Sequence, residues 1–274
     1  MRRRVFLQAL GLPLLHPVRE ALLPRTPPLE PIGLQLYTVR DLMRMDMART
    51  LEQVAKVGYR EVEFAGYFGE TPARIRGLLD GLGLTSPSSH LSLREIGPDL
   101  GRTLDLAQTI GHRYLVVPSL DPQDRRTLDD YRRVAGALNR AGEAARSRGL
   151  RVAYHNHDFE LQPIDGVLPF DVLFRDTDPA LVFFEMDFYW MASGRADPLT
   201  YFERHPGRFH LCHLKDMDRH GRMADVGAGD LDFPAILRGR ERAGLRHYFV
   251  ERDDPPDPLA SIRASHRFLR RLEL

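Results

Sequence analysis

From residue 32 onward, short apolar segments alternate with longer stretches in which apolar residues recur at helical spacing. Continuous apolar runs are typical of parallel strands buried on both faces, and the longer period is typical of amphipathic helices. The alternation therefore predicts β-strands joined by helical crossovers. Eight such strands are expected, at residues 32–37, 61–64, 84–90, 114–118, 151–155, 181–187, 209–213 and 247–251.

Helix-ending signals divide the chain in the same way. Gly58, Gly83, Gly111 and Gly149 each follow a stretch with helical spacing, which is a common C-terminal signal. An open doubly wound sheet would also fit the alternation, but no G-x-G-x-x-G turn follows the first strand, and eight strands favour a closed barrel. We predict a single-domain α/β fold, a (β/α)8 TIM barrel over residues 31–274, with helices at 50–57, 71–83, 100–110, 127–148 and 259–272.

The first thirty residues have a different character. A basic start is followed by a short apolar segment and a proline-rich stretch that ends at Pro31, which resembles an export signal. The order Arg3-Arg4-x-Phe6-Leu7 is typical of the twin-arginine route. We therefore expect residues 1–30 to be a twin-arginine-type signal with a Pro-rich linker, and the protein to be periplasmic or otherwise exported. The alternative is a loosely packed N-terminal extension on a cytoplasmic protein.

Charge and cysteine content narrow the candidate partners. The net charge is +1, from 39 basic and 38 acidic residues, which gives no support for a nucleic-acid partner. Cys212 is the single cysteine, so an internal disulfide and a cysteine-rich zinc site are excluded. We expect a small-molecule partner, with no membrane partner beyond export, and leave a homo-oligomer open. Any bound metal must be held by histidines and carboxylates.

Ionisable residues gather where the expected strands end. Active sites of (β/α)8 barrels lie at the carboxyl ends of the strands. Buried carboxylates and imidazoles cost free energy unless they are paired or bind a metal, so a purely structural barrel has no reason to collect them. The polar residues at these ends are Gln35, Tyr37, Glu61, Glu63, His90, His155, His157, Glu185, Asp187, His213 and Glu251.

Four of these residues form the expected metal site. His155, Asp187, His213 and Glu251 lie at the tips of neighbouring strands of the expected barrel. Mixed imidazole and carboxylate ligands suit manganese, zinc, iron, cobalt or nickel better than calcium, which prefers oxygen ligands alone. We predict one divalent metal ion, with magnesium also left open.

Other residues are expected to contact the substrate or support the site. Glu185 lies one layer deeper than Asp187, where it would orient a ligand histidine or form a buried salt bridge. Lys215 would stabilise a developing enolate, or bind a hydroxyl or phosphate. Residues 226–229 lack the strand and helix of a nucleotide loop, so we expect a flexible loop over the site. The expected substrate-binding residues are His157, Glu63, His90 and Trp190.

Several motifs, taken in order, resemble the sugar phosphate isomerase/epimerase family, which has a xylose isomerase-like barrel. They are Tyr154-His-Asn-His157, Glu185-Met-Asp-Phe-Tyr-Trp190, His213-Leu-Lys-Asp216, Val226-Gly-Ala-Gly229 and Phe249-Val-Glu-Arg-Asp253. The resemblance implies a divalent metal held by a residue on the fifth strand, Asp187, His213 and Glu251. It also implies proton transfer next to a sugar carbonyl.

His155 departs from the family pattern. Many isomerases and epimerases of this group carry glutamate there, so that two glutamates face each other across the substrate. We expect a metal-dependent keto-sugar isomerase or epimerase with Glu251 as base, His155 as acid and Lys215 assisting. The main alternative is a keto-glycoside lyase or hydrolase, since proton abstraction can lead to elimination. A non-catalytic sugar-binding protein and an abasic-site nuclease would also fit the barrel, although the near-zero net charge speaks against the nuclease.

Overall fold

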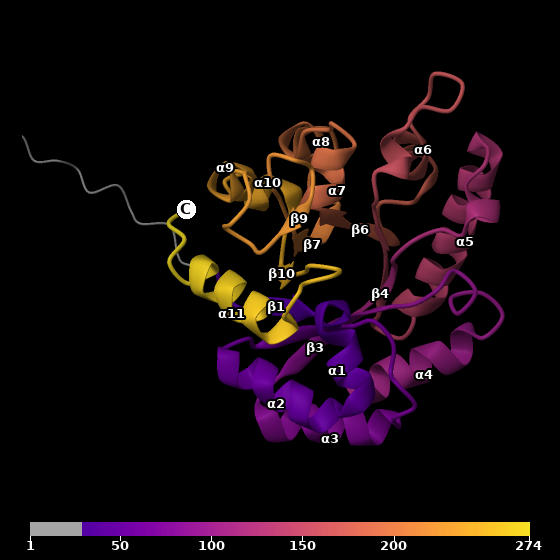
Figure 1. Ribbon diagram of the computed structural model, residues 1–274. Helices are drawn as coiled ribbons and strands as arrows, with labels where there is room; N and C mark the ends of the chain where they lie inside the picture. The colour runs from indigo at the N-terminus through magenta and orange to yellow at the C-terminus, as the bar shows by residue number, and fades with distance from the viewer. Residues whose placement is uncertain (1–28) are drawn as a thin grey trace, which may run out of the picture.

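The computed structural model describes residues 29–274, and the expected signal lies outside these described residues (Figure 1). Eight parallel strands form a closed barrel in the order β1-β10-β7-β6-β5-β4-β3-β2, so the predicted (β/α)8 fold is confirmed. The barrel closes where Ile32 pairs with Tyr248. The strands are β1 (Ile32–Gln35), β2 (Glu61–Phe64), β3 (Thr85–His90), β4 (Tyr114–Val117), β5 (Arg151–His155), β6 (Val182–Asp187), β7 (Phe209–Leu214) and β10 (His247–Val250).

The first strand is shorter than the sequence pattern predicts. Leu36 and Tyr37 belong to a 3-10 turn, η1 (Leu36–Val39), and not to the strand. The Gln35 side chain accepts a hydrogen bond from the Tyr37 N–H at 3.0 Å, so the chain turns where a strand ladder would otherwise continue.

Helices surround the barrel, and the long ones agree with the sequence pattern (Figure 1). Those without a predicted counterpart are eight residues long or shorter, too short to show helical spacing clearly. The expected helices are α2 (Met47–Val57), α3 (Pro72–Leu82), α4 (Leu100–Ile110), α5 (Leu128–Arg146) and α11 (Pro258–Leu269). The others are α1 (Arg40–Met45), α6 (Pro169–Asp176), α7 (Phe188–Ser193), α8 (Pro198–Arg204), α9 (Phe233–Leu237) and α10 (Arg240–Ala243).

The barrel interior changes from apolar to polar along each strand. A small cluster that includes Ala153, Leu211 and Phe249 fills it, separate from the large core between strands and helices. Side chains two residues apart share a strand face. The next inward residues on β5 and β7 are therefore His155 and His213. The same alternation that builds the interior delivers ionisable groups to the carboxyl ends of the strands.

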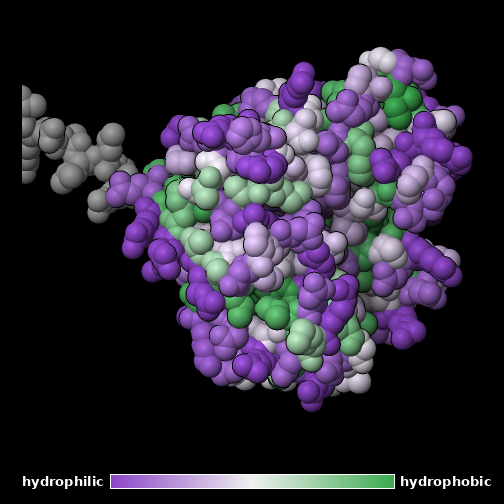
Figure 2. All heavy atoms as spheres, in the orientation of Figure 1, coloured by the Kyte–Doolittle hydropathy of each residue, from purple (hydrophilic) through white to green (hydrophobic). Residues whose placement is uncertain are grey.

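The outer surface offers few apolar residues. On the face shown in Figure 2, hydrophilic residues dominate and hydrophobic residues lie in small patches between them. Large exposed hydrophobic side chains among the described residues are scattered, namely Tyr37, Met45, Val167 and Leu199. Between residues 29 and 274, no helix has both the length and the apolar character needed to cross a membrane.

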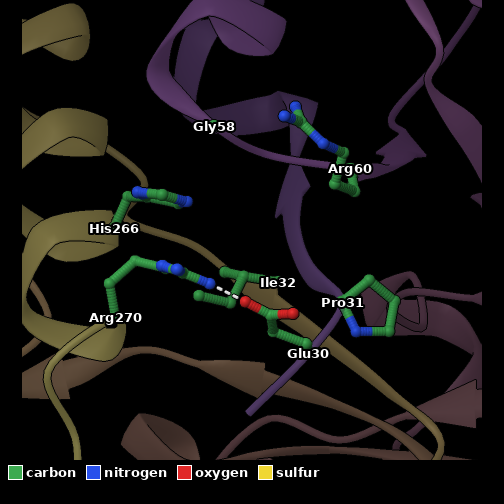
Figure 3. A pocket seen from close by; sticks show the side chains of 7 residues that line it. All are labelled: Glu30, Pro31, Ile32, Gly58, Arg60, His266 and Arg270. Atoms are coloured by element: carbon green, nitrogen blue, oxygen red, sulfur yellow. Dashed lines mark ion pairs between the residues drawn. The ribbon is translucent and has the colours of Figure 1, made fainter. Parts of the chain in front are cut away.

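A pocket of about 590 Å³ lies at the amino end of β1 (Figure 3). Glu30 and Arg270 form an ion pair across it. Because catalytic groups of such barrels lie at the opposite, carboxyl ends of the strands, we do not assign this pocket as the active site. Its lining residues are Glu30, Pro31, Ile32, Gly58, Arg60, His266 and Arg270.

The segment after β5 is fixed by three polar side chains. Asn156 accepts the Asp187 N–H at 3.2 Å, which ties the segment to β6. Asp158 accepts the Ser193 hydroxyl at 2.9 Å, which ties it to α7. Glu160 lies in a short 3-10 turn, η3 (Phe159–Leu161), and is fully buried.

Glu160 holds the backbone next to His155. It accepts the His157 N–H at 2.8 Å and the hydroxyl of Tyr154. Burial raises the pKa of Glu160 to about 7, although the hydrogen bonds from Tyr154 and His157 act in the opposite direction. The carboxyl group of Glu160, whose pKa is raised, thus helps to hold the carboxyl end of β5 in place.

The raised pKa of Glu160 predicts a loss of stability as pH rises. The unfolded chain ionises Glu160 near pH 4.5 and the folded chain near pH 7, so ionisation favours unfolding over that interval. Glu160→Gln, which mimics the protonated group, should flatten the dependence of unfolding free energy on pH by about 3 kcal/mol between pH 4.5 and 7. Urea unfolding at a series of pH values measures this. The exposed Glu143→Gln is the control, and an unchanged slope in Glu160→Gln would contradict the assignment.

Candidate active site

His213 lies at the centre of the polar end of the barrel and is fully buried. Its Nδ1 is 2.9 Å from Glu251 Oε2 and 3.7 Å from Asp187 Oδ2. Its Nε2 is 2.9 Å from Glu63 Oε2 and 3.2 Å from Glu185 Oε2. Burial alone would lower the pKa of His213, but Glu185 and Glu251 raise it well above the usual value. One imidazole therefore separates two sets of possible metal ligands.

The first set, here called the outer set, is His155, Asp187, His213 and Glu251, whose ligand atoms lie within 4.8 Å of one another. His155 Nδ1 is 2.9 Å from the Pro118 carbonyl oxygen. Since a carbonyl can only accept, Nδ1 carries the hydrogen and Nε2 presents its lone pair.

Two atoms of the outer set are buried without a hydrogen-bond partner. They are His155 Nε2 and Asp187 Oδ2, and they lie 3.4 Å apart. The other oxygen of Asp187 caps α7 by accepting the Trp190 N–H at 3.0 Å. Buried polar atoms are rarely left unpaired, and nitrogen and oxygen lone pairs aimed together suit a divalent cation. The outer set therefore fits a metal ion.

The second set, here called the inner set, is Glu63, His90, Glu185 and His213. Its atoms form a closed ring, because His90 Nε2 lies 3.2 Å from Glu63 and 3.0 Å from Glu185, and His213 Nε2 also contacts both carboxylates. Gln35 donates to Glu63 at 2.7 Å. Burial would lower the pKa of His90, but Glu63 and Glu185 raise it to about 9. In the inner set, one oxygen of each carboxylate is thus paired with imidazoles, while the other oxygens, Glu63 Oε1 and Glu185 Oε1, are buried without a hydrogen-bond partner.

Lys215 links the outer set to the pocket. Its Nζ lies 2.9 Å from Glu251 Oε2, 2.6 Å from Asp253 Oδ1 and 3.5 Å from Asp187 Oδ2, and only 2% of the residue is exposed. Burial would lower the pKa of Lys215, but these carboxylates raise it above its usual value. For Glu251, burial would raise the pKa, and Lys215 and His213 lower it. A proton donor and a proton acceptor are therefore held side by side.

A cavity of about 590 Å³ opens over this pair. His157 lies beside it, with its ring 5.4 Å from the Phe159 ring and 5.0 Å from the Trp190 ring. Burial, followed by His155, lowers the pKa of His157 to about 2, and its buried Nδ1 has no partner. The cavity is lined by Tyr37, Ala65, Gly66, Tyr67, His90, Leu91, Ser92, Glu95, Pro118, Ser119, Asp121, His155, His157, Lys215, Glu251 and Asp253.

The residues expected to support the site or bind substrate differ in whether they contact His213, line the cavity or pack against His157. Glu185 touches the Nε2 of His213, which is the contact needed to orient that ring. Glu63 lies in the inner set and does not line the cavity. Trp190 packs behind His157, with its ring centre 5.3 Å from Lys215 Nζ.

Sequence reasoning missed part of the cavity wall. Asp121 follows β4 by a few residues, so its place near a strand end was a usable signal. Glu95 lies in a segment with no helical or strand pattern and gave none. Residues 226–229, expected to form a flexible loop over the site, do not line the cavity, because two of their backbone N–H groups bind the buried Asp216.

Known proteins of similar sequence act on sugar-like molecules. An inosose dehydratase of Lacticaseibacillus casei is 25% identical over 262 residues, covering 80% of this chain and 86% of the relative. An inosose dehydratase of Clostridium tetani is 28% identical over 130 residues, 40% of this chain and 43% of the relative. These similarities support a sugar-modifying barrel enzyme.

Solved structures agree with the fold. A sugar phosphate isomerase/epimerase of Parabacteroides distasonis superposes with a TM-score of 0.77 at 26% identity, covering 93% of this chain and 99% of the other. The IOLI protein, solved with a bound zinc atom, superposes with a TM-score of 0.68 at 14% identity, covering 86% and 95%, and so shares the fold.

The family model for xylose isomerase-like TIM barrels matches residues 51–272. That segment contains every strand of the closed barrel except β1. The resemblance found in the sequence motifs is thereby confirmed, and the chain belongs to the xylose isomerase-like TIM barrel family.

Proposed function

We propose that this protein is a metal-dependent lyase that removes a proton next to the carbonyl of a keto-sugar and expels an oxygen substituent from the following carbon. The observation that carries the proposal is the contrast between His155 and the Glu251–Lys215 pair. His155 Nδ1 is bonded to the Pro118 carbonyl and its unpaired Nε2 points towards Asp187, whereas the paired Glu251 carboxylate and Lys215 ammonium face the cavity. The inosose dehydratases, whose name describes the loss of water from a keto-polyol, support the same reading.

The outer set would hold the metal. Its unpaired atoms include a ring nitrogen, His155 Nε2, beside Asp187 Oδ2, whereas in the inner set the Nε2 atoms of both imidazoles already contact carboxylates and the unpaired atoms are Glu63 Oε1 and Glu185 Oε1. When bound, a divalent cation would polarise the keto oxygen and favour loss of the neighbouring proton. Glu185 and Glu63 would keep the His213 ring turned so that Nδ1 faces the cation.

The residues of the pair divide the proton transfers. The Glu251 carboxylate takes the proton from the carbon next to the carbonyl, and the electron pair left behind forms a carbon–carbon double bond as the β carbon–oxygen bond breaks. The Lys215 ammonium gives its proton to the departing oxygen, which leaves as water or as an alcohol. Since Glu251 Oε2 and Lys215 Nζ are 2.9 Å apart, the proton gained by Glu251 can return to Lys215 and restore both groups.

His155 is a weak candidate for a second acid or base. It stands where the two-glutamate enzymes place their other carboxylate. Its Nδ1 hydrogen is bonded to the Pro118 carbonyl, and its Nε2 lies against Asp187. This arrangement suits a metal ligand and leaves no proton aimed at the substrate, which disfavours the symmetrical two-base mechanism.

Isomerisation or epimerisation stays the second candidate, because it shares the first step. The specific observation in its favour is that Lys215 lies beside Glu251, where it could return a proton to carbon.

A sugar-binding protein without catalysis and an abasic-site nuclease fit the site less well. Sugar binding alone would not need the buried ion pair of Lys215 and Glu251. The carboxylates of Glu95, Asp121 and Asp253 in the cavity wall oppose the phosphates of a nucleic acid.

Substitution of the pair should separate the two steps. In deuterated water, Glu251→Gln should slow exchange of the proton next to the carbonyl at least ~100-fold in NMR spectra of inosose and a keto-sugar panel. Lys215→Met should retain more exchange than elimination, because only the leaving oxygen loses its acid. Glu143→Gln, an exposed substitution on α5 outside the cavity, is the control for a change of charge, and thermal unfolding checks the fold. Full exchange in Glu251→Gln would exclude Glu251 as the base.

Metal analysis distinguishes the two ligand sets. The purified protein should carry one equivalent of divalent metal, and Asp187→Asn should lower its affinity at least ~10-fold, since a neutral amide replaces a charged ligand while still able to cap α7. Glu63→Gln, a matched change in the inner set, should keep one equivalent. Loss of metal in Glu63→Gln together with retention in Asp187→Asn would reverse the assignment.

A further inference from the structure

We propose that the substrate carries no phosphate group and is recognised as an uncharged, hydroxyl-rich keto-sugar. The inference rests on the proposed function for the reaction, but its evidence comes from a different part of the barrel. The loop that could bind a phosphate is already filled by the protein's own carboxylate, Asp216, and the one ammonium group on the cavity wall, Lys215, is neutralised.

The loop after the seventh barrel strand is the first line of evidence. In (β/α)8 barrels, a phosphate is frequently bound by the loops after strands seven and eight, through backbone N–H groups. Here β7 is followed by a two-stranded hairpin, β8 (Asp216–Met217) with β9 (Met223–Ala224), and then by the glycine-containing segment 226–231. This segment belongs to the loop after the seventh barrel strand, one of the two loops in which a phosphate site would be expected.

Four backbone N–H groups of this region converge on Asp216. Gly227 and Gly229 donate to Oδ2 at 2.9 and 3.0 Å. Met217 and Leu231 donate to Oδ1 at 2.8 and 3.2 Å. The carboxylate is fully buried, so these donors are already satisfied by an internal anion.

Residue 229 lies very close to the Asp216 carboxylate. A Cβ atom at residue 229 would lie 2.3 Å from Asp216 Oδ1, so only glycine allows this approach. The Val226-Gly-Ala-Gly229 motif therefore serves to enclose a side chain of the same protein.

The basic side chains around the cavity are already paired with carboxylates or packed against aromatic rings. Among the described residues that line it, Lys215 is the one lysine or arginine, and three carboxylates lie within 3.5 Å of its Nζ. The His157 ring is packed between the rings of Phe159 and Trp190, at 5.4 and 5.0 Å. His90 Nε2 lies 3.2 Å from Glu63 and 3.0 Å from Glu185, so it is occupied by these two carboxylates.

Arg40, which contacts the lining residue Tyr37, and Arg125, which contacts Leu120 next to the lining residue Asp121, are engaged elsewhere. Arg40 lies over the Tyr37 ring at 4.1 Å and pairs with Asp254 at 2.6 Å. Arg125 lies over the Phe159 ring at 3.8 Å and donates to the Leu120 carbonyl at 3.1 Å.

The wall of the cavity suits hydroxyl groups. Glu95, Asp121 and Asp253 supply carboxylate acceptors, and Tyr67 and Ser119 supply hydroxyls. A phosphate dianion entering here would meet like charges and would lose hydration without gaining a partner. Sugar hydroxyls, in contrast, can donate to these carboxylates.

Paired sugars test the inference with the metal-loaded protein. D-fructose and D-tagatose are compared with their 6-phosphates by proton exchange in deuterated water and by calorimetric binding. The unphosphorylated member of each pair should be turned over or bound at least roughly tenfold better. A sugar phosphate preferred over its parent sugar would overturn the inference. Binding of the parent sugars without any exchange would instead contradict the proposed reaction and leave the substrate class supported.

Inorganic phosphate gives a test that needs no substrate. At constant ionic strength, phosphate should produce no saturable rise in the melting temperature of the wild-type protein, and a saturable rise that persists after metal chelation would overturn the inference. Asp216→Gly exposes the four N–H groups, so this variant should gain a phosphate-dependent rise. Asp218→Gly is the matched control, because Asp218 also accepts backbone N–H groups, at 2.8 and 3.0 Å, but outside this cradle. An identical response of the two variants would also contradict the assignment of Asp216.

Discussion

The site depends on one buried imidazole that is shared between carboxylates on two sides. His213 has Glu251 and Asp187 at Nδ1, and Glu63 and Glu185 at Nε2. Unpaired, each of these groups would be costly to bury, so they fix one another's positions across the barrel. The two-residue repeat of the strands places this polar layer directly above the apolar interior. The contacts that pair the buried charges also direct the lone pairs of the outer-set nitrogen and oxygen atoms towards one point.

The two histidines after β5 have separate roles because different neighbours hold them. The Pro118 carbonyl fixes the hydrogen of His155 on Nδ1, which turns its free nitrogen towards Asp187. Glu160 fixes the backbone of His157. His155 thereby joins the ligand set proposed for the metal, and His157 faces the cavity. In the proposed mechanism, histidine at position 155 in place of glutamate leaves the acid–base steps to Glu251 and Lys215.

Sequence patterns could predict much of this arrangement because it follows from local periodicity. Apolar runs identify the strands, and the rule that barrel sites lie at strand ends brings together His155 and Asp187. The inner set could not be predicted, because the contact between His213 and Glu63 joins residues 150 positions apart and depends on how the barrel closes. Asp216 ends the His213-Leu-Lys-Asp216 motif, which suggests a catalytic or binding role. The hairpin that begins at Asp216 instead directs its side chain to the backbone of the following loop, where it accepts the Gly229 N–H.

The most direct test of this account is an anomalous diffraction map from crystals of the manganese- or zinc-loaded protein. A single peak is expected at coordination distance, about 2.0–2.2 Å, from His155 Nε2, Asp187, His213 Nδ1 and Glu251. A peak among Glu63, His90, Glu185 and His213 Nε2 would contradict it, because the inner set would then hold the metal and His155 would be free to act on the substrate.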